Sequence, residues 1–193
     1  EYPALTPDQA AAFESIRAAL DSGASARFLL HGVTGSGKTE VYLRCIEEAL
    51  RMGKSALVLV PEIALIPQAT SRFRRRFGES VAVLHSRLSG AQRAALWRGA
   101  RSGEIRIVIG ARSAVFVPLA RLGIIVVDEE QDSSFKQEDK PRYSAVQAAE
   151  FRARREGAGR CGDDAVEPAL RHQDRRRAPG RTGRGASAAT RPR

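Results

Sequence analysis

Short apolar runs alternate with longer stretches of helical pattern along the first 155 residues. The runs are rich in Val, Ile and Leu and have no polar face, as strands buried on both sides require. The stretches between them are long enough for the crossover helices that join parallel strands. The pattern predicts strands at 27–30, 56–60, 81–84, 105–109 and 124–127, and helices at 7–20, 38–52, 63–77, 89–102 and 144–155. We therefore expect an α/β fold, a parallel sheet with helices on both faces.

A glycine-rich segment follows the first predicted strand. Residues 32–39 read GVTGSGKT, which completes the spacing G-x-x-x-x-G-K-S/T between a strand and a helix. Such a loop points successive backbone N–H groups at a polyphosphate, where any Cβ would obstruct it. The residues assigned to nucleotide binding here are Gly32, Thr34, Gly35, Ser36, Gly37, Lys38 and Thr39. Lys38 is expected to reach the β- and γ-phosphates of ATP and Thr39 to hold Mg²⁺. The alternative is a glycine-rich turn that matches by accident.

Two carboxylates follow the last predicted strand. Asp128 and Glu129 come directly after the run 124–127, at the sheet edge where open α/β folds bind ligands. With a phosphate loop upstream, Asp128 is expected to hold Mg²⁺ and Glu129 to orient or deprotonate the water that attacks the γ-phosphate. We assign Lys38, Asp128 and Glu129 as the catalytic residues. The alternative is an acidic loop after a core strand.

Composition narrows the class of partner. The formal net charge is +10, which favours a polyanion such as nucleic acid. The two cysteines have no metal-ligand spacing, so we expect reduced thiols, a cytoplasmic protein and no zinc site in this chain. No apolar run approaches the roughly 20 residues needed to span a bilayer, so no membrane partner is expected.

The last 38 residues differ from the rest. Residues 156–193 contain no aromatic side chain, and 25 of the 38 are Ala, Gly, Pro or Arg. Such a segment cannot bury enough apolar surface to offset its ordering entropy, so we divide the chain into a domain at 1–155 and a disordered tail at 156–193. One interpretation of the abrupt change is an out-of-frame reading of a GC-rich gene. An authentic basic tail that binds nucleic acid is the other.

Several segments together closely resemble one helicase family. They are residues 5–9 (LTPDQ), 32–42 (GVTGSGKTEVY), 59–65 (LVPEIAL), 84–86 (LHS), 108–114 (VIGARSA), 128–137 (DEEQDSSFKQ) and 141–143 (PRY). In order and spacing they are similar to the bacterial replication-restart DNA helicases, the primosomal N-prime family of superfamily 2. The resemblance implies the first RecA-like lobe of a P-loop NTPase, a 3′ to 5′ helicase that uses ATP and Mg²⁺. It also implies single-stranded or forked DNA, primosome proteins and single-strand-binding proteins as partners, in the bacterial cytoplasm at the nucleoid.

The same resemblance assigns further residues. Gln9 would contact adenine. The residues that would contact DNA are Pro61, Glu62, Arg112, Ser113, Phe135, Lys136 and Arg142. Arg112 is the expected phosphate contact, with an ordinary surface charge as the alternative. Phe135 and Tyr143 could stack on bases or serve as core anchors.

The chain departs from the family pattern in two respects. Gln131 stands where the family normally has His, so coupling between motifs is expected to be altered, because only His can carry a proton. The family's next strand, its Gly-Ser/Thr-Ala-Thr-Pro-Ser motif and its second lobe are not recognisable after residue 155. We therefore expect a truncated piece with an open sheet edge beyond the acidic strand. A non-catalytic nucleotide- and DNA-binding remnant is the alternative function.

Overall fold

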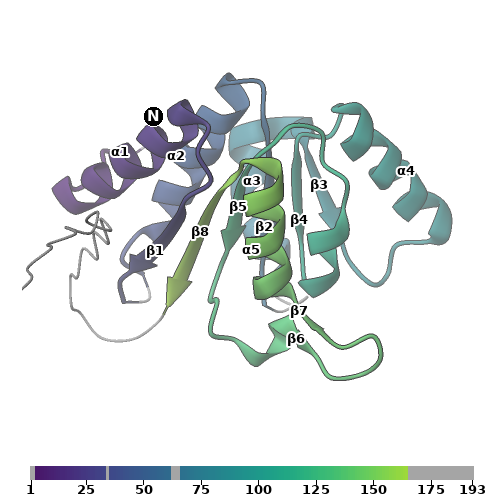
Figure 1. The fold of residues 1–193 in the computed structure, drawn as a ribbon. Helices are drawn as coiled ribbons and strands as arrows, with labels where there is room; N and C mark the ends of the chain where they lie inside the picture. The colour runs from purple at the N-terminus through teal and green to yellow at the C-terminus, as the bar shows by residue number, and fades with distance from the viewer. Residues whose placement is uncertain (1–2, 34, 62–65, 165–193) are drawn as a thin grey trace, which may run out of the picture.

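The computed structural model describes residues 3–33, 35–61 and 66–164, and its centre is a six-stranded parallel sheet (Figure 1). The strands are β1 (Arg27–His31), β2 (Ser55–Leu59), β3 (Val81–Leu84), β4 (Ile107–Gly110), β5 (Leu122–Val127) and β8 (Gly159–Asp164). They lie in the order β1-β8-β5-β2-β4-β3, and every neighbouring pair is parallel. The predicted parallel sheet is confirmed, and all five predicted strands are present.

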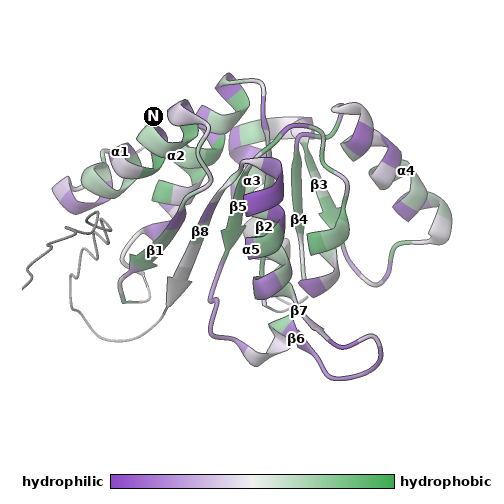
Figure 2. Ribbon diagram, viewed as in Figure 1, coloured by the Kyte–Doolittle hydropathy of each residue, from purple (hydrophilic) through white to green (hydrophobic). Residues whose placement is uncertain are grey.

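Helices cover both faces of the sheet, as the alternating pattern predicted. They are α1 (Pro7–Ser22), α2 (Lys38–Arg51), α3 (Ile66–Phe77), α4 (Gly90–Ser102) and α5 (Ala145–Glu156). Ala56 and Val58 of β2 join one buried cluster with residues of α1, α2 and α3, whereas Leu57 and Leu59 join a second cluster with residues of α4 and α5. Figure 2 shows the central strands in the green of apolar residues, as a strand covered on both faces requires.

The sixth strand was not predicted, and it corrects the boundary of the tail. Residue 156 ends α5, Gly157 caps that helix in the left-handed conformation, and β8 follows at Gly159–Asp164. Disorder from residue 156 onward is therefore wrong for the stretch up to 164, and the rest of the predicted tail lies outside the described residues. The strand forms despite its polar sequence because it pairs along most of its length with both of its neighbours, β1 and β5.

The position of β8 also corrects the expected open edge. β5 lies between β2 and β8, so the strand that carries the acidic residues is paired on both sides. The edges of the described sheet are β1 and β3. A further strand after α5, which the family pattern includes, is therefore present in this chain with a different sequence.

A small hairpin projects beyond the sheet after β5. Its strands β6 (Lys136–Gln137) and β7 (Tyr143–Ser144) pair antiparallel, and a single turn of 3-10 helix, η4 (Ser133–Phe135), leads into it. The hairpin lies below the sheet in Figure 1, and its loop is drawn in the purple of polar residues in Figure 2. No helix among the described residues is long and apolar enough to cross a membrane.

Thiol reactivity tests the placement of β8. Cys161 is 1% exposed and Cys45 is fully buried, and burial raises the pKa of the Cys45 thiol to about 12. Since only an accessible thiolate reacts, we expect neither cysteine to react with the disulfide reagent DTNB until urea unfolds the chain. The Cys45→Ala variant isolates Cys161. Fast reaction of that variant in native buffer would show that β8 does not lie in the sheet.

Candidate nucleotide site and helicase motifs

The sheet brings the segments singled out in the sequence to one edge. Because all six strands are parallel, their carboxyl ends meet on the same side, which faces downward in Figure 1. β1 leads into residues 32–39, and β5 leads into the acidic residues 128–130. β2 and β4 lead into Pro61 and Arg112. The candidate site is thus assembled by topology from segments distant in the sequence.

The phosphate loop has the backbone geometry that its glycines permit. Gly35 and Gly37 have φ angles of 83° and 82°, a region that residues with a Cβ rarely adopt. Gly37 is the N-cap of α2, so the positive end of that helix points into the loop. A Cβ on Gly32 would lie 2.7 Å from Ser36 Oγ, so the loop is also tightly closed on itself. Thr34 lies outside the described residues.

Lys38 and Thr39 are the first two residues of α2, at the mouth of this loop. Lys38 Nζ donates to the carbonyl oxygens of Gly32 and Val33, which holds the ammonium group inside the curve of the loop. Gln9 approaches from α1, where it completes a capping box with Thr6, and its Nε2 donates to Ser36 O over 2.9 Å. α1 is therefore tied directly to the phosphate loop. The predicted contact of Gln9 with adenine stays a prediction.

The acidic residues lie one strand away from the loop, because only β8 separates β1 from β5. The Asp128 backbone N–H donates to Leu59 O over 2.9 Å, which continues the β2–β5 ladder to the first carboxylate. Glu129 has a φ of 53°, an uncommon angle for a residue with a side chain, and its carbonyl accepts from Asp132 N over 2.8 Å. This turn ends the strand and presents both half-buried carboxylates at the sheet edge.

These residues fit a nucleotide and a magnesium ion. The left-handed glycines, the helix N-terminus and Lys38 are features that favour an anion, and Asp128 and Thr39 carry oxygen atoms of the kind that Mg²⁺ binds. No group of three or more His, Cys, Asp or Glu side chains among the described residues could hold a metal ion by itself. In nucleotide sites, Mg²⁺ is bound by one or two protein carboxylates together with substrate phosphates.

A second set of hydrogen bonds ties the acidic turn to two other strand ends. Arg112 Nη1 donates to the carbonyls of Lys136, at 2.6 Å, and Ser134, at 3.3 Å. Ser134 Oγ donates to Pro61 O over 2.6 Å. The carboxylate of Asp132 accepts from Ser134 N, and this bond holds the pKa of Asp132 below its usual value. That stabilisation is present at neutral pH and is lost as the pH falls through the lowered pKa.

The predicted DNA contacts have mixed outcomes. Phe135 is 1% exposed and packs in the core, so the core-anchor alternative is confirmed for this residue and the predicted base stacking is wrong. The Arg112 guanidinium is already used on backbone carbonyls, Pro61 is buried, and Glu62 lies outside the described residues. Ser113, Lys136 and Arg142 are exposed, so a DNA contact by these three stays a prediction.

A cavity beside the hairpin combines residues that the sequence singled out with others, such as Gln147, that it did not. It measures about 580 Å³, and its lining includes Lys136, Arg142, Tyr143 and Gln147. Phe116 is half exposed, and its ring lies 5.0 Å from that of Tyr143 in an edge-to-face arrangement. Phe116 thus offers exposed aromatic surface next to this cavity, which the buried Phe135 does not. Phe116 comes two residues after the segment 108–114, and this nearness is the signal by which the sequence could have identified it.

Comparison with known proteins places these motifs in a family. The sequence profile of the DEAD/DEAH box helicases matches residues 6–154. The Replication restart protein PriA of Bacillus subtilis is 56% identical over 149 residues, which is 77% of this chain and 18% of that protein. PriA of Haemophilus influenzae is 58% identical over 118 residues, or 61% of this chain and 16% of that protein. The chain thus spans about a fifth of the length of these curated relatives.

Solved structures agree on the fold. A structure of RecG bound to a three-way DNA junction superposes with a TM-score of 0.68 at 24% identity, over 86% of this chain and 22% of that chain. The Hef helicase domain of Pyrococcus furiosus gives 0.57 at 18% identity, over 82% of this chain and 33% of that chain. The sheet therefore has the RecA-like helicase fold. Because the profile also matches most of its length, this chain belongs to the DEAD/DEAH box helicase family, and over that span it is similar to PriA proteins.

Proposed function

We propose that this chain is the first RecA-like lobe of an ATP-dependent DNA helicase that acts in replication restart. The observation that carries the proposal is the phosphate loop and the acidic turn at one edge of a helicase-type sheet, in a chain half identical to PriA proteins. The finer parts of the proposal are 3′ to 5′ polarity, action on single-stranded or forked DNA, and work with primosome and single-strand-binding proteins in the bacterial cytoplasm.

The chain's own residues have distinct tasks at the nucleotide. The backbone N–H groups of residues 32–39 and the N-terminus of α2 hold the phosphates, and Lys38 neutralises their charge. Thr39 and Asp128 would hold Mg²⁺, which neutralises charge on the phosphate oxygens when it is bound. Glu129 orients the attacking water and accepts its proton. The rate enhancement comes from positioning the reactants and neutralising charge, so each of these side chains contributes only while it is held in the correct place.

The DNA would lie along the same edge, on the hairpin side. The exposed cations Lys136 and Arg142 border the cavity beside the hairpin and can neutralise backbone phosphates. Phe116 and Tyr143 offer ring surface on which bases can stack. In this account Arg112 is a positioning residue, because it holds the carbonyls of Ser134 and Lys136 and so fixes the start of the hairpin.

The activity of the isolated chain is a separate matter from that of a longer protein. The resemblance implies that the ATP site of this family lies between two lobes, and the match covers only 18% of the Bacillus subtilis relative. We therefore expect the chain alone to bind Mg-ATP and to hydrolyse it slowly. A nucleotide- and DNA-binding piece without turnover is the competing function.

Two lysine variants separate the proposed sites. Lys38→Ala should weaken ATP binding by about tenfold or more, because it removes a charge-assisted contact to phosphate. Lys136→Ala removes the same charge from the hairpin and should leave ATP affinity unchanged while it weakens binding of single-stranded DNA. Fluorescent-nucleotide titration and DNA anisotropy measure the two effects. Equal loss of ATP affinity in both variants would contradict the assignment of the phosphate loop.

Glu129 gives a test of turnover. Glu129→Gln keeps the size of the side chain but cannot accept a proton, so ATP affinity should stay within about twofold while hydrolysis falls on the order of 100-fold. Steady-state phosphate release with and without single-stranded DNA measures it. If the unsubstituted chain releases no phosphate above the Glu129→Gln level, the competing function without turnover is correct for the isolated chain.

The role of Arg112 is tested by its conservative variant. Arg112→Ala and Arg112→Lys should both increase amide hydrogen exchange over residues 133–137, because a lysine cannot reproduce the fork of donors on two carbonyls. Arg142→Ala, which removes an exposed arginine of the same hairpin, is the matched control and should leave this segment protected. The positioning role is contradicted if amide exchange over residues 133–137 is unchanged in both Arg112 variants. If Arg112→Lys also keeps the DNA affinity, Arg112 instead contacts a DNA phosphate.

A further inference from the structure

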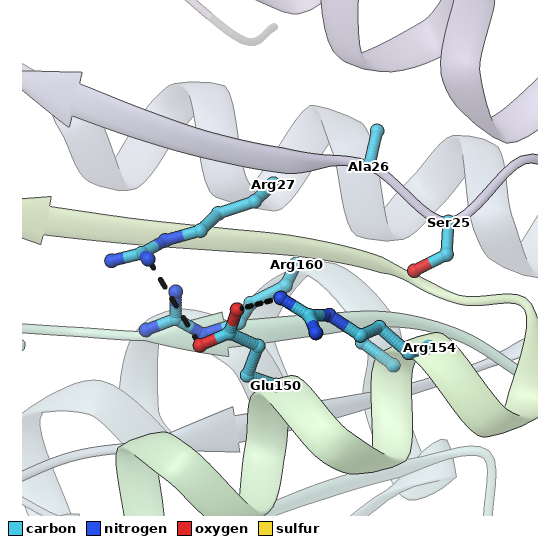
Figure 3. Close-up of a pocket in the computed structure, with 7 residues that line it drawn as sticks. Ser25, Ala26, Arg27, Glu150, Arg154 and Arg160 are labelled. Carbon is cyan, nitrogen blue, oxygen red and sulfur yellow. Dashed lines mark hydrogen bonds and ion pairs between the residues drawn. The ribbon is translucent and has the colours of Figure 1, made fainter.

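A second concentration of charge lies away from the nucleotide site, where β1 begins. A cavity of about 370 Å³ lies between β1, β8 and α5, and it is lined by Ser25, Ala26, Arg27, Glu150, Arg154 and Arg160, among others (Figure 3). The phosphate loop follows the other end of β1, so the two sites are separate. Three arginines and one glutamate thus border one small space.

Arg160 is the unusual member of this group. It lies on β8, the second strand from the β1 edge of the sheet, and is 1% exposed; its Nε and Nη1 have no hydrogen-bond partner among the described residues. Its Nη2 lies 2.6 Å from Glu130 Oε2, an ion-pair distance without the alignment of a hydrogen bond. A buried guanidinium that leaves donors unused is costly, and an oxygen-rich ligand beside it would offset that cost.

The two exposed arginines at the cavity already bind carboxylate anions. Arg154 and Arg27 approach the two carboxylate oxygens of Glu150 from opposite sides, at 2.5 and 3.9 Å, as Figure 3 shows. Arg27 also pairs with Glu130 at 3.0 Å. The side chains of Arg27 and Arg154 are 54% and 74% exposed, so they can move to admit a ligand without disturbing the core. The Glu150 carboxylate lies where an external anion would be held.

We infer that this cavity is a binding site for a phosphate-type oxyanion, held by Arg27, Arg154 and Arg160 after Glu150 swings aside. Three guanidinium groups from three different elements converge on it, and a tetrahedral oxyanion has enough oxygens to accept from all of them. The cavity volume lies in the range of small-molecule sites. The oxyanion comes either as free inorganic phosphate or as a phosphodiester of bound DNA.

Titration with inorganic phosphate at constant ionic strength tests the site, with calorimetry as the readout. The full chain carries Lys38→Ala, so that the phosphate loop does not contribute. Saturable binding is expected, and Arg154→Ala should weaken it about tenfold. Glu150→Gln should tighten it, because it removes the competing carboxylate. The matched control is Arg155→Ala, which removes an exposed arginine from the same turn of α5 but does not line the cavity. The phosphate affinity of the Arg155→Ala variant should stay within about twofold of that of the parent chain.

A parallel titration with an oligothymidylate, followed by anisotropy over a range of salt concentrations, distinguishes the two sources. If the ligand is a DNA phosphodiester, Arg154→Ala weakens DNA binding and flattens its salt dependence more than Arg155→Ala does. If the ligand is free phosphate, the two variants bind DNA alike and differ only with phosphate. The proposal is overturned if neither probe distinguishes Arg154→Ala from Arg155→Ala, which would mean that the cavity holds water. Arg160→Met adds a direct check, but the two α5 variants carry the test if that buried variant fails to fold.

Discussion

The strict parallel pairing of the sheet is the constraint on which the rest of the structure depends. A parallel strand can be joined to its neighbour only by a crossover, so every strand here ends at the same edge. That edge collects the phosphate loop after β1, the acidic turn after β5 and the segments after β2 and β4. β8 completes the arrangement, because it pairs with both β1 and β5 and fixes the distance between loop and acids.

Backbone carbonyls, more than side-chain pairs, join the segments at this edge. Ser134 donates to Pro61 O, and Arg112 donates to two carbonyls at the start of the hairpin. Gln9 Nε2 donates to Ser36 O and so joins α1 to the phosphate loop. Such contacts depend on the path of the chain and not on the identity of the accepting residue. Because the Asp132 N–H donates to Glu129 O, a displacement of the hairpin is expected to move the acidic turn as well.

The parts of the fold that the sequence predicted are those with local signals. Apolar runs predicted the five strands. The spacing of Gly32, Gly37 and Lys38 predicted the phosphate loop, because such a loop is defined by residues close together in the sequence. β8 has no such signal: Gly159, Arg160 and Gly162 carry no apolar pattern, and the strand exists because two distant strands offer it hydrogen bonds. Whether Phe135 stacks on a base or anchors the core could not be decided from the sequence for a related reason, since burial of a lone aromatic depends on tertiary packing. The partners of Arg112 are 22 and 24 residues away and are backbone atoms, which no motif specifies.

We propose that the phosphate loop and the acidic turn form one nucleotide site. The affinity of the chain for ATP, measured with Mg²⁺ and again with EDTA, tests it directly when repeated on Asp128→Asn. We predict that Mg²⁺ tightens ATP binding in the unsubstituted chain, and that Asp128→Asn removes this gain while the affinity in EDTA is unchanged. An equal gain from Mg²⁺ in both chains would show that Asp128 does not take part in the nucleotide site and would contradict the account.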